Sequence, residues 1–163
     1  MSNTNITNYQ KILEFNKAFG VEGNDKPQFN IFDENPKLVN YRLSLILEEV
    51  KELQEAIQQK DLVETVDALA DIMYVTLGAF TAIGVDADAA FDLVHKSNMS
   101  KLCISEEEPQ QTVEWYKKNE SHRYDSPNYR KSDDNIHWVV YNESTKKILK
   151  NINYSPVKFD SIL

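Results

Sequence analysis

The chain has 163 residues, a length that suits one domain with its own hydrophobic core. Hydrophobic residues make up 41% and charged residues 27%, as in ordinary soluble globular proteins. The net charge of −8 argues against a general nucleic-acid binder, although a nucleotide held through a metal ion stays compatible with it.

The first residues and the cysteine content bear on localisation. The polar start MSNTNITNYQ lacks the apolar core of a signal peptide, and no uninterrupted apolar run approaches the ~20 residues of a membrane span. The single cysteine, Cys103, cannot form an intramolecular disulfide, and we expect a buried small residue rather than a nucleophile. The sequence therefore predicts a cytoplasmic protein.

The first predicted helix covers residues 5–19. Apolar residues recur there at helical spacing, Thr7 or Asn8 can cap its start, and Gly20 is a natural stop. Phe15 and Phe19 are predicted to be core residues, with stacking on a nucleobase as the alternative. Asn16 is a candidate for reading a base edge.

A loop is predicted for residues 22–36, which are rich in Gly, Asn and Pro. It is long enough to be a lid or a substrate-facing segment. A helix then runs from about Lys37 to Gln59. Arg42, in its first half, is assigned to the surface, with phosphate contact as the alternative.

The most informative stretch is residues 45–84, where two apolar-periodic segments carry acids on either side of a polar break at residues 58–61. They predict two antiparallel helices that bring six carboxylates near one another. The second segment is apolar nearly all round, which argues for burial. The acids are Glu48, Glu49 and Glu52 in the first helix, and Glu64, Asp67 and Asp71 in the second.

Acids on a buried helix need partners, and no Lys or Arg is suitably placed. A divalent cation is the economical partner, and a set of carboxylates without Cys or His suits Mg²⁺ or Mn²⁺. From the pattern alone we favour Glu49, Glu52 and Asp71 as metal ligands. The alternative is a solvated acidic face, which we prefer for Glu55. Asp61 is predicted to cap the second helix in a capping box with Glu64, so a structural role for Glu64 stays open.

The next predicted helix is capped by Asp86 and ends near Asn98. Lys96, Asn98 and Lys101 lie near its end. Two cations and an amide at this spacing suit a triphosphate, and the two lysines equally suit a helix C-terminus. The spacing alone leaves both interpretations open.

The C-terminal third is predicted to contain a short helix over residues 106–118 and a loop over residues 119–135. Residues 136–141 read IHWVVY, a β-branched and aromatic strand, and residues 146–151 are expected to return as its hairpin partner. An extra wall for the nucleotide and an oligomer contact are both open roles for this region.

The sequence resembles the all-α nucleoside triphosphate pyrophosphohydrolases, a superfamily that includes MazG-like proteins, dimeric dUTPases and phosphoribosyl-ATP pyrophosphohydrolases. The resemblance rests on EEVKEL, on DALADIMYV, and on VHKSNMSKL at residues 94–102. The superfamily pattern is EExxE on one helix and ExxD on the next. Glu48, Glu49 and Glu52 match the first half, but Ala68 stands where the second half has Glu. Asp67 or Glu64 can replace that acid.

The resemblance implies a mainly α protein: a helical bundle with a small C-terminal β-hairpin appended. We expect one domain, residues 1–163, with a catalytic core over residues 1–104 and an extension over residues 105–163. The implied activity is metal-dependent hydrolysis of (deoxy)nucleoside triphosphates to a monophosphate and pyrophosphate, by a homodimer or homotetramer.

Within this activity, the resemblance adds Asp67 to the metal ligands and favours Asn98 and Lys101 as phosphate contacts. Glu48 or Glu49 is the candidate for activating water. Two other classes were weighed. A di-iron bundle needs Glu-x-x-His pairs, which are absent from residues 45–84. A non-catalytic acidic helical interaction module remains the alternative.

Overall fold

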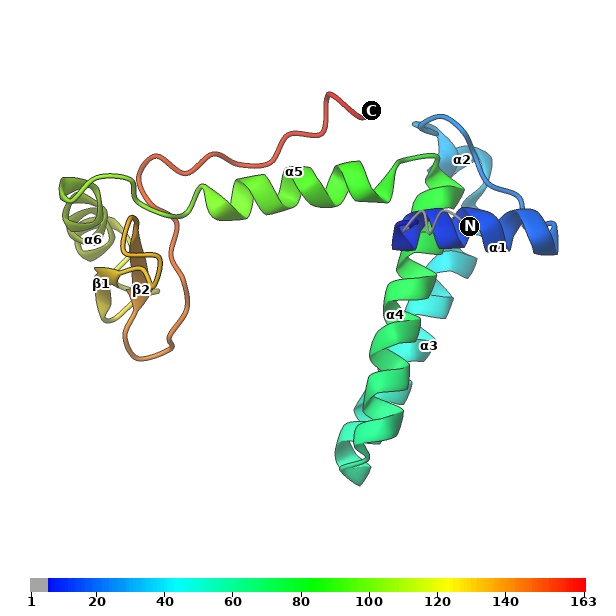
Figure 1. The fold of residues 1–163 in the computed structure, drawn as a ribbon, viewed down its shortest axis with the longest axis horizontal. Coiled ribbons are helices and arrows are strands. Elements are labelled where there is room, and N and C mark those ends of the chain that lie inside the picture. The colour runs from blue at the N-terminus through cyan, green and yellow to red at the C-terminus, as the bar shows by residue number, and fades with distance from the viewer. Residues whose placement is uncertain (1–5) are drawn as a thin grey trace, which may run out of the picture. The chain divides into compact units, whose positions relative to one another are not determined.

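The computed structural model describes residues 6–163. Within them it shows six helices and a two-stranded antiparallel hairpin, so the predicted fold class is confirmed (Figure 1). The chain divides into two compact units. The first extends up to Ala90 and includes Asp160–Leu163, and the second is Phe91–Phe159. The predicted division at residue 104 lies within the second unit.

The first helix, α1, runs over Asn8–Phe19 and is capped at both ends. The side chain of Thr7 accepts a hydrogen bond from the amide of Gln10, whose own side chain accepts one from the Thr7 amide, so Thr7 completes a capping box. Gly20 ends the helix in the left-handed conformation, with φ of 66°. Residue 5, where the predicted helix starts, lies outside the described residues.

The segment predicted as a loop contains a short helix, α2, at Ile31–Glu34, so that prediction is wrong in part. Ile31 is buried, which explains the turn of helix. The preceding loop is tied to the end of the fourth helix, because the side-chain amide of Asn24 donates to the carbonyl of Ala82 at 2.6 Å. Gly84 is required there: its φ is 74°, and a Cβ would lie 1.9 Å from the Lys26 carbonyl oxygen.

Two long antiparallel helices dominate the first unit (Figure 1): α3 at Pro36–Gln59 and α4 at Leu62–Ile83. Asn35 caps α3 by accepting from the amide of Leu38. Asp61 caps α4 as predicted, accepting from the amides of Val63 and Glu64. The predicted capping box is wrong, because the Asp61 amide donates to the Ala56 carbonyl rather than to Glu64.

Helix α4 is far more exposed than its apolar composition predicts. Its buried positions are the small residues Ala68, Gly78, Thr81 and Ala82. By length and composition alone, α4 would be able to cross a membrane, a test that core helices of soluble proteins also pass. The expectation that this helix is buried is wrong for the single chain, because many of its large side chains face outward: Leu62, Val63, Val66, Leu69, Met73 and Tyr74.

Helix α5 covers Ala87–Met99, so it begins in the first unit and continues in the second. The predicted role of Asp86 is confirmed, because its carboxylate accepts a hydrogen bond from the amide of Ala89 at 3.1 Å. Asp88 in the first turn accepts from the Thr7 hydroxyl at 2.6 Å, which ties the start of α5 to the start of α1.

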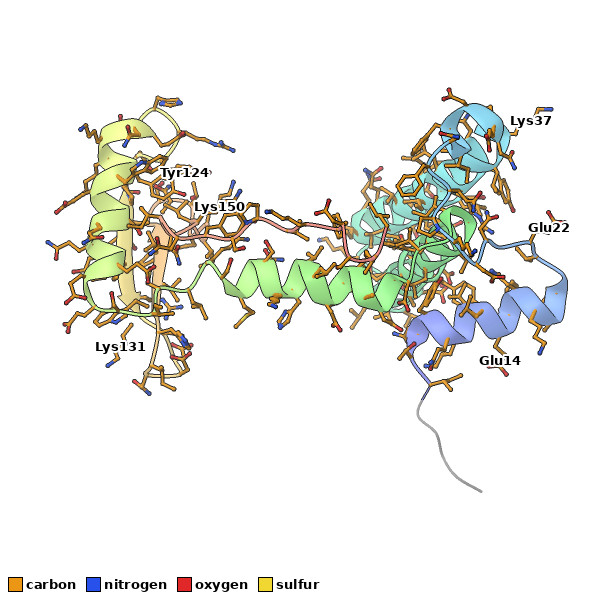
Figure 2. The ribbon with its side chains drawn as sticks, turned by 90° about the horizontal axis from the view of Figure 1, so that it is seen from above. Glu14, Glu22, Lys37, Tyr124, Lys131 and Lys150 are labelled. Atoms are coloured by element: carbon orange, nitrogen blue, oxygen red, sulfur yellow. The ribbon has the colours of Figure 1, made fainter. Side chains whose placement is uncertain are left out.

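The second unit packs helix α6, at Glu107–Asn119, against a hairpin of β1, at Pro127–Lys131, and β2, at Trp138–Asn142. The strand predicted over residues 136–141 is confirmed as β2, but its hairpin partner is β1 rather than the predicted residues 146–151. β1 lies inside the segment predicted as a loop, and the predicted return strand contributes only a bridge between Tyr141 and Ile148. At the turn end of the hairpin, the Lys131 ammonium lies 5.6 Å from the Trp138 ring centroid. Figure 2 labels Lys131 there.

A closed hydrophobic core holds the second unit together, with Tyr124 and Trp138 packed against it. Cys103 belongs to it and is fully buried, as expected. Burial raises the pKa of its thiol to about 11, so it is not a nucleophile at neutral pH. The buried members of this core are Cys103, Val113, Tyr116, Val140 and Leu149.

Candidate active site

The centre of the candidate site is Glu49, on the side of α3 that faces α4. One of its carboxylate oxygens, Oε2, is buried and has no hydrogen-bond partner. Burial raises the pKa of the Glu49 carboxyl, and Glu52, Asp71, Glu48 and Asp67 raise it further, in that order. Five of the six predicted acids therefore lie close enough to act on one another electrostatically.

The other four of these acids, unlike Glu49, point into solvent. Among residues 6–163, no three His, Cys, Asp or Glu side chains converge on a single point where they would hold a metal ion. The structure thus places Glu48, Glu52, Asp67 and Asp71 around Glu49, without assembling a closed coordination shell in one chain.

The side chains around Glu49 fit a hard divalent cation. They offer carboxylate oxygens only, which is the donor set of Mg²⁺ and Mn²⁺. A buried carboxylate oxygen without a partner is costly, and a cation would supply the missing partner. Mg²⁺ needs few protein ligands, because it keeps several waters and is completed by substrate phosphates.

Two further acids of the region have structural roles. Glu55 faces solvent and forms an ion pair with Lys51 at 3.6 Å, one turn earlier on α3. Glu64 lies in the first turn of α4, where its amide is capped by Asp61 and its negative charge suits the helix N-terminus.

Helix α1 brings aromatic side chains beside the acidic face of α4. Phe15 and Phe19 stack with centroids 4.3 Å apart, and Phe15 meets Tyr74 edge to face at 5.7 Å. Phe19 is 70% exposed and Phe15 37%, so the prediction that they are core residues is wrong. Asn16 is buried and donates to the Thr81 hydroxyl at 3.0 Å, which fixes α1 against α4.

The candidate phosphate contacts belong to the second unit. Lys96 is exposed on the last turns of α5. The Lys101 ammonium donates to the Asn98 side-chain oxygen at 2.6 Å, so these two residues hold each other in place.

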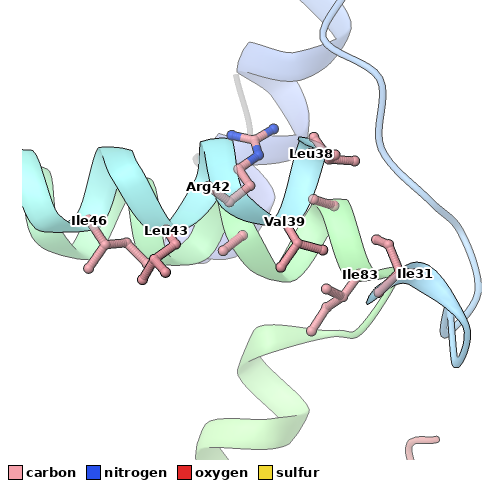
Figure 3. A pocket seen from close by; sticks show the side chains of 9 residues that line it. Ile31, Leu38, Val39, Arg42, Leu43, Ile46 and Ile83 are labelled. Carbon is pink, nitrogen blue, oxygen red and sulfur yellow. The ribbon is translucent and has the colours of Figure 1, made fainter. Parts of the chain in front are cut away.

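An apolar hollow of about 190 Å³ lies between α2, the start of α3 and the end of α4 (Figure 3). Its lining is aliphatic except for Arg42, whose guanidinium points away from the other labelled side chains in Figure 3. This hollow lacks the polar groups that a phosphate chain would need. The residues that line it include Ile31, Leu38, Val39, Leu43, Ile46 and Ile83.

Sequence reasoning gave no role to Tyr74, which lies beside the acids, and it assigned Arg42 to the surface with phosphate contact only as the alternative. Tyr74 lies one turn after Asp71, and the Nε of Arg42 is buried without a hydrogen-bond partner. A signal for Arg42 was present in the sequence: it is seven residues before Glu49, so both lie on one face of α3.

Comparison with known proteins identifies the family of the chain. The profile of the phosphoribosyl-ATP pyrophosphohydrolase family matches residues 12–98. The chain belongs to this family, and through it to the all-α nucleoside triphosphate pyrophosphohydrolase superfamily. An uncharacterized protein of Acanthamoeba polyphaga mimivirus is 30% identical, with 96% of each chain covered. Family membership supports a nucleotide pyrophosphohydrolase-like activity on a nucleotide substrate, in a family that is generally metal-dependent.

Proposed function

We propose that this protein hydrolyses (deoxy)nucleoside triphosphates between the α- and β-phosphates, releasing a nucleoside monophosphate and pyrophosphate. The observation that carries the proposal is the buried, unpartnered oxygen of Glu49, surrounded by the charges of four more acids on two antiparallel helices. Such a concentration of like charge destabilises the fold unless a cation joins it, and perturbed carboxyls of this kind mark functional sites.

The proposed ligands of the ion, Mg²⁺ or Mn²⁺, are Glu49, Glu52, Asp67 and Asp71. Asp67 takes the place of the acid that the family pattern has at Ala68. The ion, when bound, supplies neutralisation of the phosphate charge and acidifies a bound water. The four residues would bind and orient the ion, and their carboxylates would accept hydrogen bonds from the waters around it.

A carboxylate of α3 takes the proton of the attacking water. Glu48 and Glu49 are the candidates, because both belong to the acid cluster and each can hold a proton at a carboxylate oxygen. The water oxygen forms a bond to phosphorus, the phosphoanhydride P–O bond breaks, and its electron pair leaves with the departing phosphate group. The products are the monophosphate and pyrophosphate.

The nucleoside end of the substrate is proposed to meet α1. Phe15, Phe19 and Tyr74 present exposed aromatic surface beside the acids, and aromatic faces stack on bases. Asn16, whose amide already donates to Thr81, would read a base edge through its remaining oxygen. The family resemblance supports Asn98 and Lys101 as the proposed phosphate contacts, and the spacing of the cations adds Lys96.

A second copy of the chain is proposed to cover the exposed apolar side of α3 and α4, giving a homodimer or homotetramer. Exposed side chains as large as Val66, Leu69 and Met73 along one helix are unusual for a chain that works alone. Burying them against the same surface of another copy would complete a helical bundle.

The test is pyrophosphate release from a panel of ribo- and deoxyribonucleoside triphosphates, with Mg²⁺, with Mn²⁺ and with EDTA. We expect metal-dependent release of pyrophosphate together with the matching monophosphate. Release of inorganic phosphate instead would contradict the proposed bond, and release from none of the panel would contradict the substrate class.

The same preparation separates this function from a non-catalytic interaction module. A divalent ion that binds the folded state must raise its melting temperature. We expect a rise with Mg²⁺ or Mn²⁺ that is lost when Glu49 is replaced by Gln. The absence of any shift with divalent ions would favour the interaction module.

A further inference from the structure

We propose that Arg42 is a phosphate-binding residue, and that its guanidinium, in the space left beside Gly78, forms an anion site on the same face of α3 as Glu49. The inference deepens the proposed function, on which it rests, because it names a further residue that contacts the phosphate chain of the substrate. The EExxE and ExxD pattern of the family does not include this position.

The first observation is the state of the Arg42 side chain. Its Nε is buried and lacks a hydrogen-bond partner, and Arg42 forms no ion pair in the part of the chain that the structure describes. A guanidinium carries a permanent charge and five N–H donors. Holding it partly desolvated without a carboxylate is costly, and an anionic ligand would offset that cost.

The second observation is the residue against which Arg42 lies. Gly78 is in the middle of α4, where glycine is less favourable than alanine for helix stability. A Cβ at this position would lie 3.0 Å from Nη1 of Arg42. The glycine therefore leaves room for the guanidinium against α4.

The third observation is the line that joins Arg42 to the acids. Arg42 and Glu49 are seven residues apart on α3, so they share a face at about 10 Å along the helix axis. Each carries one of the two buried side-chain atoms that lack partners in residues 6–163, one a donor and the other an acceptor. A carboxylate that binds a metal ion and a guanidinium on the same helix face would together present positive charge to a chain of phosphates.

The chemistry favours a phosphate over a base for Arg42. A nucleobase is neutral and would leave the buried charge uncompensated. A triphosphate carries about four negative charges and accepts paired hydrogen bonds from a guanidinium. The neighbouring Tyr41 ring, 5.9 Å from the guanidinium carbon, supports the charge from the other side without neutralising it.

The experiment measures binding by calorimetry, in Mg²⁺, of two probes: inorganic tripolyphosphate and the nucleoside of the triphosphate that is hydrolysed fastest. We expect Arg42→Met to weaken tripolyphosphate binding by about tenfold or more, as a lost charge-assisted hydrogen bond does, and to leave the nucleoside unaffected. KM for the triphosphate should rise more than kcat falls, and Arg42→Lys should restore part of the affinity.

Two further variants separate phosphate binding from a structural role. Lys51→Met removes a cation from the opposite side of α3, nine residues on, and should change neither probe. Gly78→Ala keeps the arginine but displaces its guanidinium, so it should weaken tripolyphosphate binding without lowering the melting temperature.

Unchanged tripolyphosphate binding in both Arg42→Met and Gly78→Ala would overturn the inference, as would equal losses in Lys51→Met. A loss confined to the nucleoside would overturn it too, because Arg42 would then read the base. The proposed function fails separately: a wild-type protein that binds tripolyphosphate through Arg42 yet releases no pyrophosphate would refute the hydrolysis and leave the anion site standing.

Discussion

The two units of this chain differ in how far each completes its own core. In Phe91–Phe159, large side chains such as Tyr116, Val140 and Leu149 are enclosed between α6 and the hairpin. In the first unit, α4 buries small residues and leaves its large apolar ones exposed. The second unit therefore encloses its own core, whereas the first unit leaves large apolar side chains exposed, as the proposed homo-oligomer requires.

The polar groups follow the same division. In the second unit, the Asp125 carboxylate accepts hydrogen bonds from Asn142, Ser126 and Ser144. No buried side-chain atom of this network lacks a hydrogen-bond partner. In the first unit, Glu49 and Arg42 each keep a buried atom without a partner. Buried groups that lack partners are rare in folded proteins, and within residues 6–163 both of them lie in the first unit, where we propose that the ligand binds.

The largest expected effect tests whether the chemistry belongs to the first unit. Glu52→Gln removes a proposed metal ligand but keeps the shape of an exposed side chain, so the fold should be retained. Mutating residues that only support metal ligands typically lowers metal affinity or activity by about ten- to a hundredfold. For a proposed ligand we therefore expect kcat/KM to fall by roughly a hundredfold or more. Pyrophosphate release and circular dichroism measure the two outcomes.

The matched control for this loss is Glu55→Gln on the same helix, which breaks only the exposed pair with Lys51. Its activity should stay close to wild type, because exposed pairs contribute little. Turnover at the wild-type rate in a folded Glu52→Gln protein would contradict the assignment of Glu52 as a metal ligand.

The second prediction tests whether the first unit is completed by another copy. Met73→Glu places a charge on the exposed apolar face of α4, where Met73 is 55% exposed. We expect the oligomer to dissociate, as measured by light scattering after size exclusion. Ile136→Glu, at a position 71% exposed in the second unit, should leave the mass unchanged. A monomeric wild-type protein, or equal masses for all three proteins, would contradict the proposal.

Sequence patterns predicted the helices of this fold well, because their signals are local. Asp61 and Gly84 mark the ends of α4 through side-chain and left-handed caps that need no tertiary context. The apolar periodicity on either side of the polar break likewise predicted two antiparallel helices, which bring five of the six acids near one another. These features depend only on residues within one or two turns.

What the sequence did not predict depends on partners distant in the chain. β1 reads PNYRK, a polar segment with no strand pattern, and it becomes a strand because it pairs with β2. The apolar residues of α4 were predicted to be buried, but many of its large side chains are exposed. Periodicity shows that a helix face is apolar, but it does not show whether that face is buried within the same chain. Phe19 was misplaced for the same reason, since its helical spacing is the same whether it meets a core or a ligand.

The third prediction tests whether the second unit has an independent core. Leu149→Ala opens a cavity at a position only 2% exposed, and such changes typically cost about 2–5 kcal/mol. Both tryptophans, Trp115 and Trp138, lie in this unit, so their fluorescence reports its unfolding alone. Ile148→Ala, at the neighbouring and half-exposed position, should cost much less. A loss of the α3–α4 helical signal together with the tryptophan transition would show that the units unfold as one.

The smallest expected effect concerns stability at acidic pH. It tests whether the hydrogen bonds of the second unit stabilise its folded state. Hydrogen bonds from Ser144, Asn142 and Ser126 lower the pKa of Asp125 from 3.8 to about 2. Because the folded state holds this carboxyl ionised, its contribution to stability is present above pH 3.8 and disappears as the pH falls toward 2. Urea unfolding followed by tryptophan fluorescence should show the second unit weakening across this window. Asp125→Asn should be less stable at neutral pH and less dependent on pH within the window, because its amide cannot titrate. Identical pH slopes for the two proteins would mean that the network around Asp125 does not hold in solution.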